Sequence, residues 1–136
     1  MNILTFDIED WYCHDVESGN KEWDKLECRI YEGVDRILDS LAERNLKGTF
    51  FIVGWLAEHH PSVIKKIAEA GHQIGCHTYQ HELLTRFDKK AFYEDTRKAK
   101  QLIEDAIGQE ITAFRAPAFS ITRDNLYAFD VLGELG

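Results

Sequence analysis

Short apolar runs alternate with longer amphipathic segments along almost the whole chain. The apolar runs are rich in β-branched and aromatic residues, which predicts strands. They cover residues 3–6, 49–53, 73–77 and 111–115. The run 49–53 is apolar at every position but the first, so we expect a strand buried on both faces, with parallel neighbours.

The amphipathic segments carry apolar residues at helical spacing and have recognisable ends. They cover residues 31–44, the stretch between Pro61 and Gly71, about 89–107, and a last segment after Thr122. Pro61 suits a first helical position and Gly71 a stop. Asp88 and Thr122 are capping residues, and Gly108 follows the longest helix. The predicted order is therefore strand and helix in alternation, four times.

This alternation predicts an α/β fold with parallel strands and right-handed crossovers. The architecture is either an open doubly wound sheet or a TIM-like barrel. Four strands cannot close a barrel, because about eight are needed around a filled interior. The chain has 136 residues, which fits one domain or one piece of a larger domain.

Charge and composition exclude several classes of partner. Lys and Arg number 16 against 24 Asp and Glu, a formal net charge of −8, which argues against nucleic acid and anionic membranes. No run approaches the roughly 20 apolar residues of a membrane span, and the N-terminus does not resemble a secretory signal, so we expect a cytoplasmic protein. Cys13, Cys28 and Cys76 lack metal or disulfide spacing and are expected to be free thiols.

Polar, chemically active residues follow three of the predicted strands. The candidates are Asp7, Glu9 and Asp10 after the first strand, His77 and His81 after the third, and Arg115 at the end of the fourth. The carboxyl ends of parallel strands share one edge of the sheet, so these side chains should meet there. Imidazoles and carboxylates bind catalytic divalent metals, usually as three protein ligands with one open position. The pattern therefore predicts a metal site.

Each of these residues also has a purely structural interpretation. The spacing of His77 and His81 is weak support by itself, and Asp7 suits a turn after the first strand. We interpret His14, His59, His60 and His72 as surface residues. Three aromatic residues could stack on a sugar or simply pack, namely Trp55, Tyr79 and Phe119. The segment 11–28 is long for a strand-to-helix connection and is expected to carry function.

Four sequence blocks together resemble the polysaccharide deacetylases (carbohydrate esterase family 4, the chitooligosaccharide deacetylase homology domain). They are residues 5–10 (TFDIED), 49–54 (TFFIVG), 71–81 (GHQIGCHTYQH) and 114–117 (FRAP). The resemblance implies the N-terminal part of a distorted (β/α) TIM-like barrel. It also implies a divalent metal held by one acid and two histidines, and hydrolysis of N-acetyl groups from the amino sugars of a poly- or oligosaccharide.

The resemblance also assigns roles to individual residues. His77 and His81 correspond to the metal-binding histidines, Asp7 to the general base, and Arg115 to the residue that pairs with that base. Backbone N–H groups just after Pro117 would help form the oxyanion hole, and Phe119 would contact the substrate. The metal expected is zinc, with cobalt, nickel or manganese as alternatives.

The first block departs from the family pattern at the position after Asp7. Many members have two adjacent acids, whereas here Ile8 follows, so the carboxylate ligand is Glu9 or Asp10. We favour Glu9, because residues two apart in extended backbone point to the same side. The arrangement also resembles a branch of the superfamily that includes cyclic-amide hydrolases. In the last block, Ala118 stands where many members have an aromatic residue, one place before Phe119.

Family domains continue well past the equivalent of Gly136 and place a general-acid histidine there. We therefore expect residues 1–136 to be an incomplete N-terminal portion, whose exposed sheet edge promotes self-association. Two further hypotheses remain open. One is a non-catalytic carbohydrate- or metal-binding module, and the other is an iron(II) site with two histidines and one carboxylate.

Overall fold

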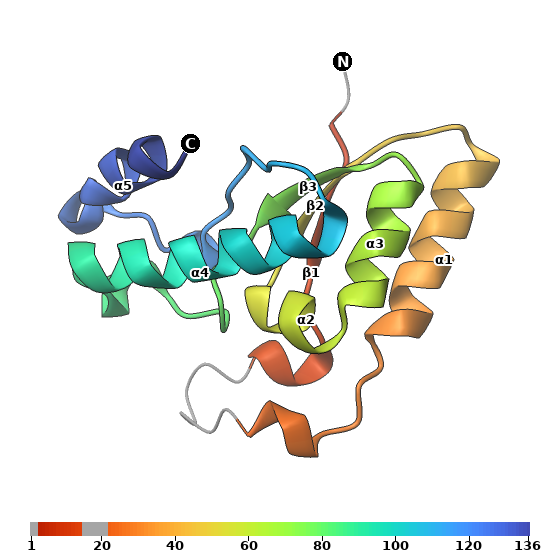
Figure 1. The fold of residues 1–136 in the computed structure, drawn as a ribbon, viewed down its shortest axis with the longest axis horizontal. Helices are drawn as coiled ribbons and strands as arrows, with labels where there is room; N and C mark the ends of the chain where they lie inside the picture. Colours follow the sequence, from red (N-terminus) through yellow and green to blue (C-terminus); the bar gives the residue numbers. More distant parts are fainter. Residues whose placement is uncertain (1–2, 15–21) are drawn as a thin grey trace.

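A parallel three-stranded sheet forms the centre of the computed structural model, which describes residues 3–14 and 22–136. Its order is β1 (Thr5–Ile8), β2 (Thr49–Ile52), β3 (Gln73–Cys76), so the strands follow their order in the sequence (Figure 1). The register is level, with Ile8 opposite Ile52 and Ile52 opposite Cys76. All three strands therefore end at the same height, and the residues that follow them meet at one edge.

The described residues also form five α-helices. They are α1 (Ile30–Glu43), α2 (Gly54–His59), α3 (Pro61–Glu69), α4 (Lys89–Ile107) and α5 (Tyr127–Leu135). Helix α3 lies between α1 and α4, and α5 packs on the other end of α4 (Figure 1). The core between helices and sheet consists of fully buried apolar side chains, among them Phe50, Ile52, Leu56, Ile64 and Ile103. No helix in the described part of the chain has the length and apolar character that a membrane span requires.

The prediction of an α/β fold with parallel strands is confirmed, and α4 is confirmed to the residue. Asp88 caps its start by accepting a hydrogen bond from the N–H of Ala91 at 2.7 Å. Gly108 ends it with a φ of 72°, the left-handed conformation that glycine adopts without strain. Pro61 begins α3, and Gly71 follows it with a φ of 77°. The three cysteines are free thiols, as predicted.

The predicted strand 111–115 is wrong, because only a single parallel bridge, between Cys76 and Phe114, forms there. The backbone N–H and carbonyl groups of Ile111 form hydrogen bonds with side chains of α4 instead. Its N–H donates to Glu104 at 2.9 Å, and its carbonyl accepts from Lys100 at 2.6 Å. Because these groups are satisfied by the helix, no sheet ladder can begin at this residue.

Two helical details also differ from the prediction. Helix α2 was not predicted, since it is short, begins at Gly54 only one residue after the end of β2 and has no capping side chain. Thr122 caps a 3-10 turn (Arg123–Asn125), and α5 begins only at Tyr127. The short α2 matters for the site because its first residues contact the loop after β3.

His72 is buried, with 7% of its surface exposed, so its assignment to the surface was wrong. Its Nδ1 accepts a hydrogen bond from the N–H of Gly48 at 3.3 Å, which requires an unprotonated Nδ1. Burial, followed by the positive charge of Lys47, lowers the pKa of His72 below its ordinary value. The folded protein therefore contains a neutral imidazole where the unfolded chain would protonate more readily.

This burial predicts a loss of stability in mild acid. Below about pH 6.5 the unfolded chain binds a proton that folded His72 does not, so the free energy of unfolding falls as the pH falls. We expect the His72→Gln variant to lose less stability than the wild type between pH 8 and pH 5.5, measured by urea unfolding. An equal loss in both proteins would contradict this origin of the acid sensitivity.

Candidate metal centre

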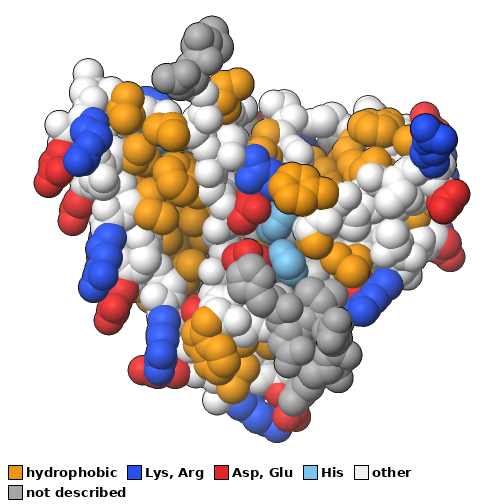
Figure 2. All heavy atoms as spheres, turned by 180° about the vertical axis from the view of Figure 1, so that it is seen from behind, with side chains coloured by type: hydrophobic (Ala, Val, Ile, Leu, Met, Phe, Trp, Pro, Cys, Tyr) orange, Lys and Arg blue, Asp and Glu red, His pale blue; other side chains and the backbone are white. Residues whose placement is uncertain are grey.

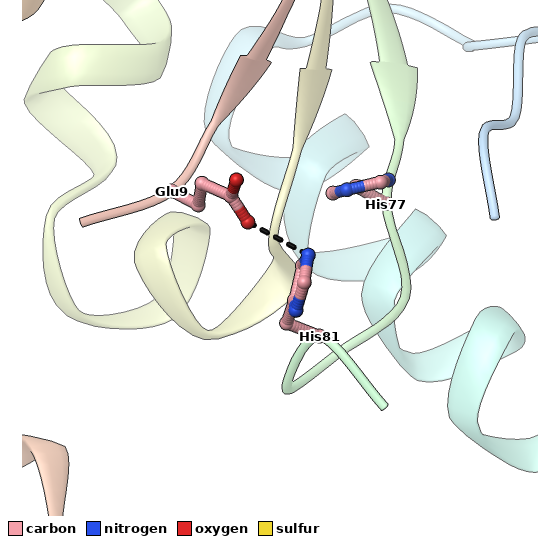
Figure 3. Close-up of side chains that lie close together, drawn as sticks. All are labelled: Glu9, His77 and His81. Atoms are coloured by element: carbon pink, nitrogen blue, oxygen red, sulfur yellow. Dashed lines mark ion pairs between the residues drawn. The ribbon is translucent and has the colours of Figure 1, made fainter. Parts of the chain in front are cut away.

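The residues that follow β1 and β3 converge at the carboxyl end of the sheet. Glu9 comes directly after β1, while His77 and His81 lie after β3 and across a turn. In Figure 3 the carboxylate and both imidazoles point toward one another. On the surface, histidine is visible near the middle of one face, next to acidic and basic side chains (Figure 2).

Glu9, His77 and His81 each offer one ligand atom, and these atoms lie within 4.8 Å of one another. The Glu9 Oε2 and His81 Nε2 atoms are 2.7 Å apart. The side chains are well shielded, with 12% of Glu9, 2% of His77 and 6% of His81 exposed. Two imidazoles and one carboxylate in so small a space fit a divalent cation such as zinc.

His77 is held in the tautomer that a metal ligand needs. Its Nδ1 lies 2.7 Å from the carbonyl oxygen of Arg115, and because a carbonyl only accepts, Nδ1 carries the hydrogen. The lone pair of the neutral ring is then on Nε2, which is the nitrogen left to bind a cation. Burial is the main cause that lowers the pKa of His77 below its ordinary value, which favours this neutral form.

A second pair of charged residues lies beside the triad. Arg115 donates one hydrogen bond to Asp7 Oδ1 and another to Thr5 Oγ1, both at 2.7 Å. The guanidinium also lies over the ring of Phe51, 4.2 Å from its centre. The other oxygen of Asp7, Oδ2, is 3.8 Å from Nε2 of His77. Asp7 is thus oriented from one side, and its second oxygen faces the metal ligands.

The structure separates Asp10 from the two imidazoles, although it too was a candidate metal ligand. Its side chain turns toward the start of α1, where Oδ2 accepts from the N–H groups of Arg29 at 2.6 Å and Ile30 at 3.0 Å. Its Oδ1 accepts from the N–H of Trp11 at 2.8 Å. Asp10 is 3% exposed and ties the segment after β1 to α1. Glu9 is therefore the carboxylate of the triad.

The substrate-side candidates lie in the turn after Arg115. Pro117 is buried, whereas Phe119 is 90% exposed. Ala118 and Phe119 have φ values of 48° and 53°, a strained conformation for residues other than glycine. Strain of this kind accumulates at functional sites, and here it holds an aromatic ring out into solvent.

The other aromatic candidates are used mainly in packing. Trp55 is 6% exposed and has edge contacts with Trp23 and Tyr12. The hydroxyl of Tyr79 donates to Glu58, and Lys98 lies over its ring. Of the segment 11–28, which was expected to carry function, residues 15–21 lie outside the described residues, as does the side chain of His14.

Two residues that support this site were not identified in the sequence. Thr5 accepts the second hydrogen bond of Arg115, and Asp95, on α4, accepts one from the backbone N–H of Tyr79 at 3.0 Å. Thr5 lies two residues before Asp7 on the same strand, so the alternation of β1 could have pointed to it. Nothing in the helical pattern of α4 distinguishes Asp95 from an ordinary polar position.

Known proteins resemble this chain in sequence. The family model described as polysaccharide deacetylase matches residues 3–133. The chain is 34% identical over 95 residues to a peptidoglycan-N-acetylglucosamine deacetylase of Bacillus cereus, covering 70% of this chain and 34% of that protein. It is also 34% identical over 74 residues to a chitooligosaccharide deacetylase of Rhizobium leguminosarum biovar trifolii, covering 54% of this chain and 34% of that one. The chain spans about a third of the length of these relatives.

A solved structure supports the fold. It is that of a mutant of a carbohydrate esterase family 4 pseudoenzyme from Bacillus anthracis, a mutant with restored enzymatic activity. The TM-score is 0.76 at 23% identity, over 98% of this chain and 41% of that one. The family model spans nearly all of the sequence, so the chain belongs to the polysaccharide deacetylase family.

Proposed function

We propose that the chain provides the metal ligands and the general base of a hydrolase that removes N-acetyl groups from the amino sugars of a poly- or oligosaccharide. The observation that carries this proposal is the position of the Asp7–Arg115 pair beside the triad of Glu9, His77 and His81. Amide hydrolysis needs a general base and an electrophilic group at one place, and this arrangement would supply both.

Each residue has a distinct task in this proposal. Glu9, His77 and His81 would hold the cation, which when bound supplies a Lewis acid for the acetyl carbonyl and lowers the pKa of water. Asp7 would accept a proton from the attacking water, since its Oδ2 faces the triad while Oδ1 is fixed by Arg115. The hydrogen bond from His77 to the Arg115 carbonyl fixes the ring for metal binding.

Three alternatives differ in how well the site supports them. An iron(II) oxygenase site has no need for an oriented acid such as Asp7 beside its ligands. A non-catalytic module remains a second candidate, because a pseudoenzyme shares this fold. A cyclic-amide hydrolase would use the same metal and base on another substrate.

The test measures acetate release from N-acetylglucosamine oligomers, by this chain and by a longer chain that includes any residues encoded after Gly136. We expect zinc-dependent release that stops with a chelator and returns with added zinc. Binding of the oligomers with no acetate from either chain would support the binding module instead. Oxygen uptake after anaerobic iron loading would support the iron site. Cleavage of cyclic amides, with no acetate release, would support the cyclic-amide hydrolase.

A further inference from the structure

The turn that connects His77 to His81 has a backbone conformation that is unfavourable by itself. It consists of Thr78, Tyr79 and Gln80 and contains no glycine. Thr78 and His81 nevertheless have φ values of 61° and 54°, in the left-handed region that is unfavourable for L-residues. Neighbouring elements must therefore stabilise the turn, and with it the position of the second imidazole.

Two helices supply that stabilisation through backbone groups of the turn. The first N–H groups of α2, on Gly54 and Trp55, donate to the carbonyl oxygens of Thr78 at 2.9 Å and Tyr79 at 2.8 Å. From the other side, Asp95 of α4 accepts a hydrogen bond from the N–H of Tyr79 at 3.0 Å. Helix α2 thus holds both peptide groups that flank Tyr79, and α4 also holds the one between Thr78 and Tyr79.

The position of Asp95 is itself rigid. The helix around it is anchored by Phe92 and Ala99, which are fully buried one turn before and one turn after it. Helix α2 lies so close to α4 that a Cβ on Gly54 would come within 2.8 Å of the Ala99 Cα atom. The carboxylate therefore has a fixed place relative to the turn, while the triad itself consists of Glu9, His77 and His81.

We propose that Asp95 is a positioning residue, whose hydrogen bond to the Tyr79 N–H places His81 and thereby sets the affinity of the triad for a divalent cation. This inference rests on the metal-binding part of the proposed function. Groups that orient metal ligands from outside typically change metal affinity by roughly 10- to 100-fold when they are removed. Asp95 acts on the backbone of the turn, through the N–H of Tyr79.

The test is isothermal titration of the chelator-treated chain with zinc chloride. We expect Asp95→Ala to weaken zinc binding by roughly 10- to 100-fold. Asp95→Asn keeps an oxygen that accepts the N–H and should bind zinc nearly as the wild type does. Glu94→Ala is the matched control, because it removes an acid from the neighbouring, exposed position of α4, where Glu94 forms an ion pair with Arg97. Its affinity should be unchanged.

Thermal unfolding in the presence of chelator shows whether each variant folds without metal. If Asp95→Ala does not fold, Asp95→Glu replaces it, since that variant keeps the charge but displaces the oxygens, and it too should weaken binding. Wild-type affinity in Asp95→Ala, or in Asp95→Glu where that variant replaces it, would overturn the inference. Equal weakening in Asp95→Asn or Glu94→Ala would overturn it as well, because charge would then be the cause. A wild-type chain that binds no zinc would instead overturn the metal site itself.

Discussion

Replacing Asp7 by Asn is expected to lower the rate of acetate release by roughly 10²- to 10⁴-fold, the usual contribution of a positioned proton-transfer group. The carboxamide has nearly the shape of the carboxylate but cannot take a proton from water. Arg115 fixes Oδ1 of Asp7 at 2.7 Å, which leaves Oδ2, 3.8 Å from Nε2 of His77, as the oxygen that faces the triad. The measurement is acetate release at saturating zinc. It uses whichever of the two chains, residues 1–136 or the longer chain, releases acetate without the substitution.

A separate measurement keeps this effect apart from metal binding. Asp7 is not part of the triad, so the zinc affinity of Asp7→Asn should remain near the wild-type value. Asp35→Asn makes the same chemical change on the surface of α1, where the carboxylate pairs with Lys66, and its rate should be unchanged. Wild-type rates in Asp7→Asn would assign the base to another group, and a loss of zinc in step with the rate would make Asp7 a ligand.

The sequence predicts best those helices and strands whose boundaries are set by their own residues or by residues directly beside them. Helix α4 begins and ends as predicted because Asp88 and Gly108 act on adjacent backbone groups. The segment 111–115 has the composition of a strand, but the groups that decide its structure, Glu104 and Lys100, come from α4. A pattern read along one segment contains no information on partners that only the packed fold supplies.

The same distinction applies to the site. Asp7, His77 and Arg115 could be proposed together because residues after parallel strands share one edge of the sheet, and the level register brings them there. The choice between Glu9 and Asp10 could only be a preference, since both come directly after β1. The free N–H groups at the start of α1, which engage Asp10, decide it. Asp95 could not be predicted, because its role depends on how α4 packs against the turn after β3.

Glu9 and Asp10 should respond to amide substitution in opposite ways. Glu9→Gln replaces the charged ligand of the triad, so zinc affinity should fall by more than the roughly 10- to 100-fold typical of groups outside the ligand shell. Stability without metal should change little. In Asp10→Asn, one of the positions that now accept N–H groups of Trp11, Arg29 or Ile30 becomes an N–H₂ donor. The free energy of unfolding should then fall by about 1–3 kcal/mol.

Zinc titration and urea unfolding in chelator, applied to both variants, separate the two roles. Asp10→Asn should bind zinc with nearly wild-type affinity at temperatures where it is folded, since its oxygens face α1 rather than the imidazoles. If Glu9→Gln bound zinc strongly and Asp10→Asn did not, Asp10 would be the metal ligand in place of Glu9. The segment after β1 would then have to rotate away from α1 when the metal binds.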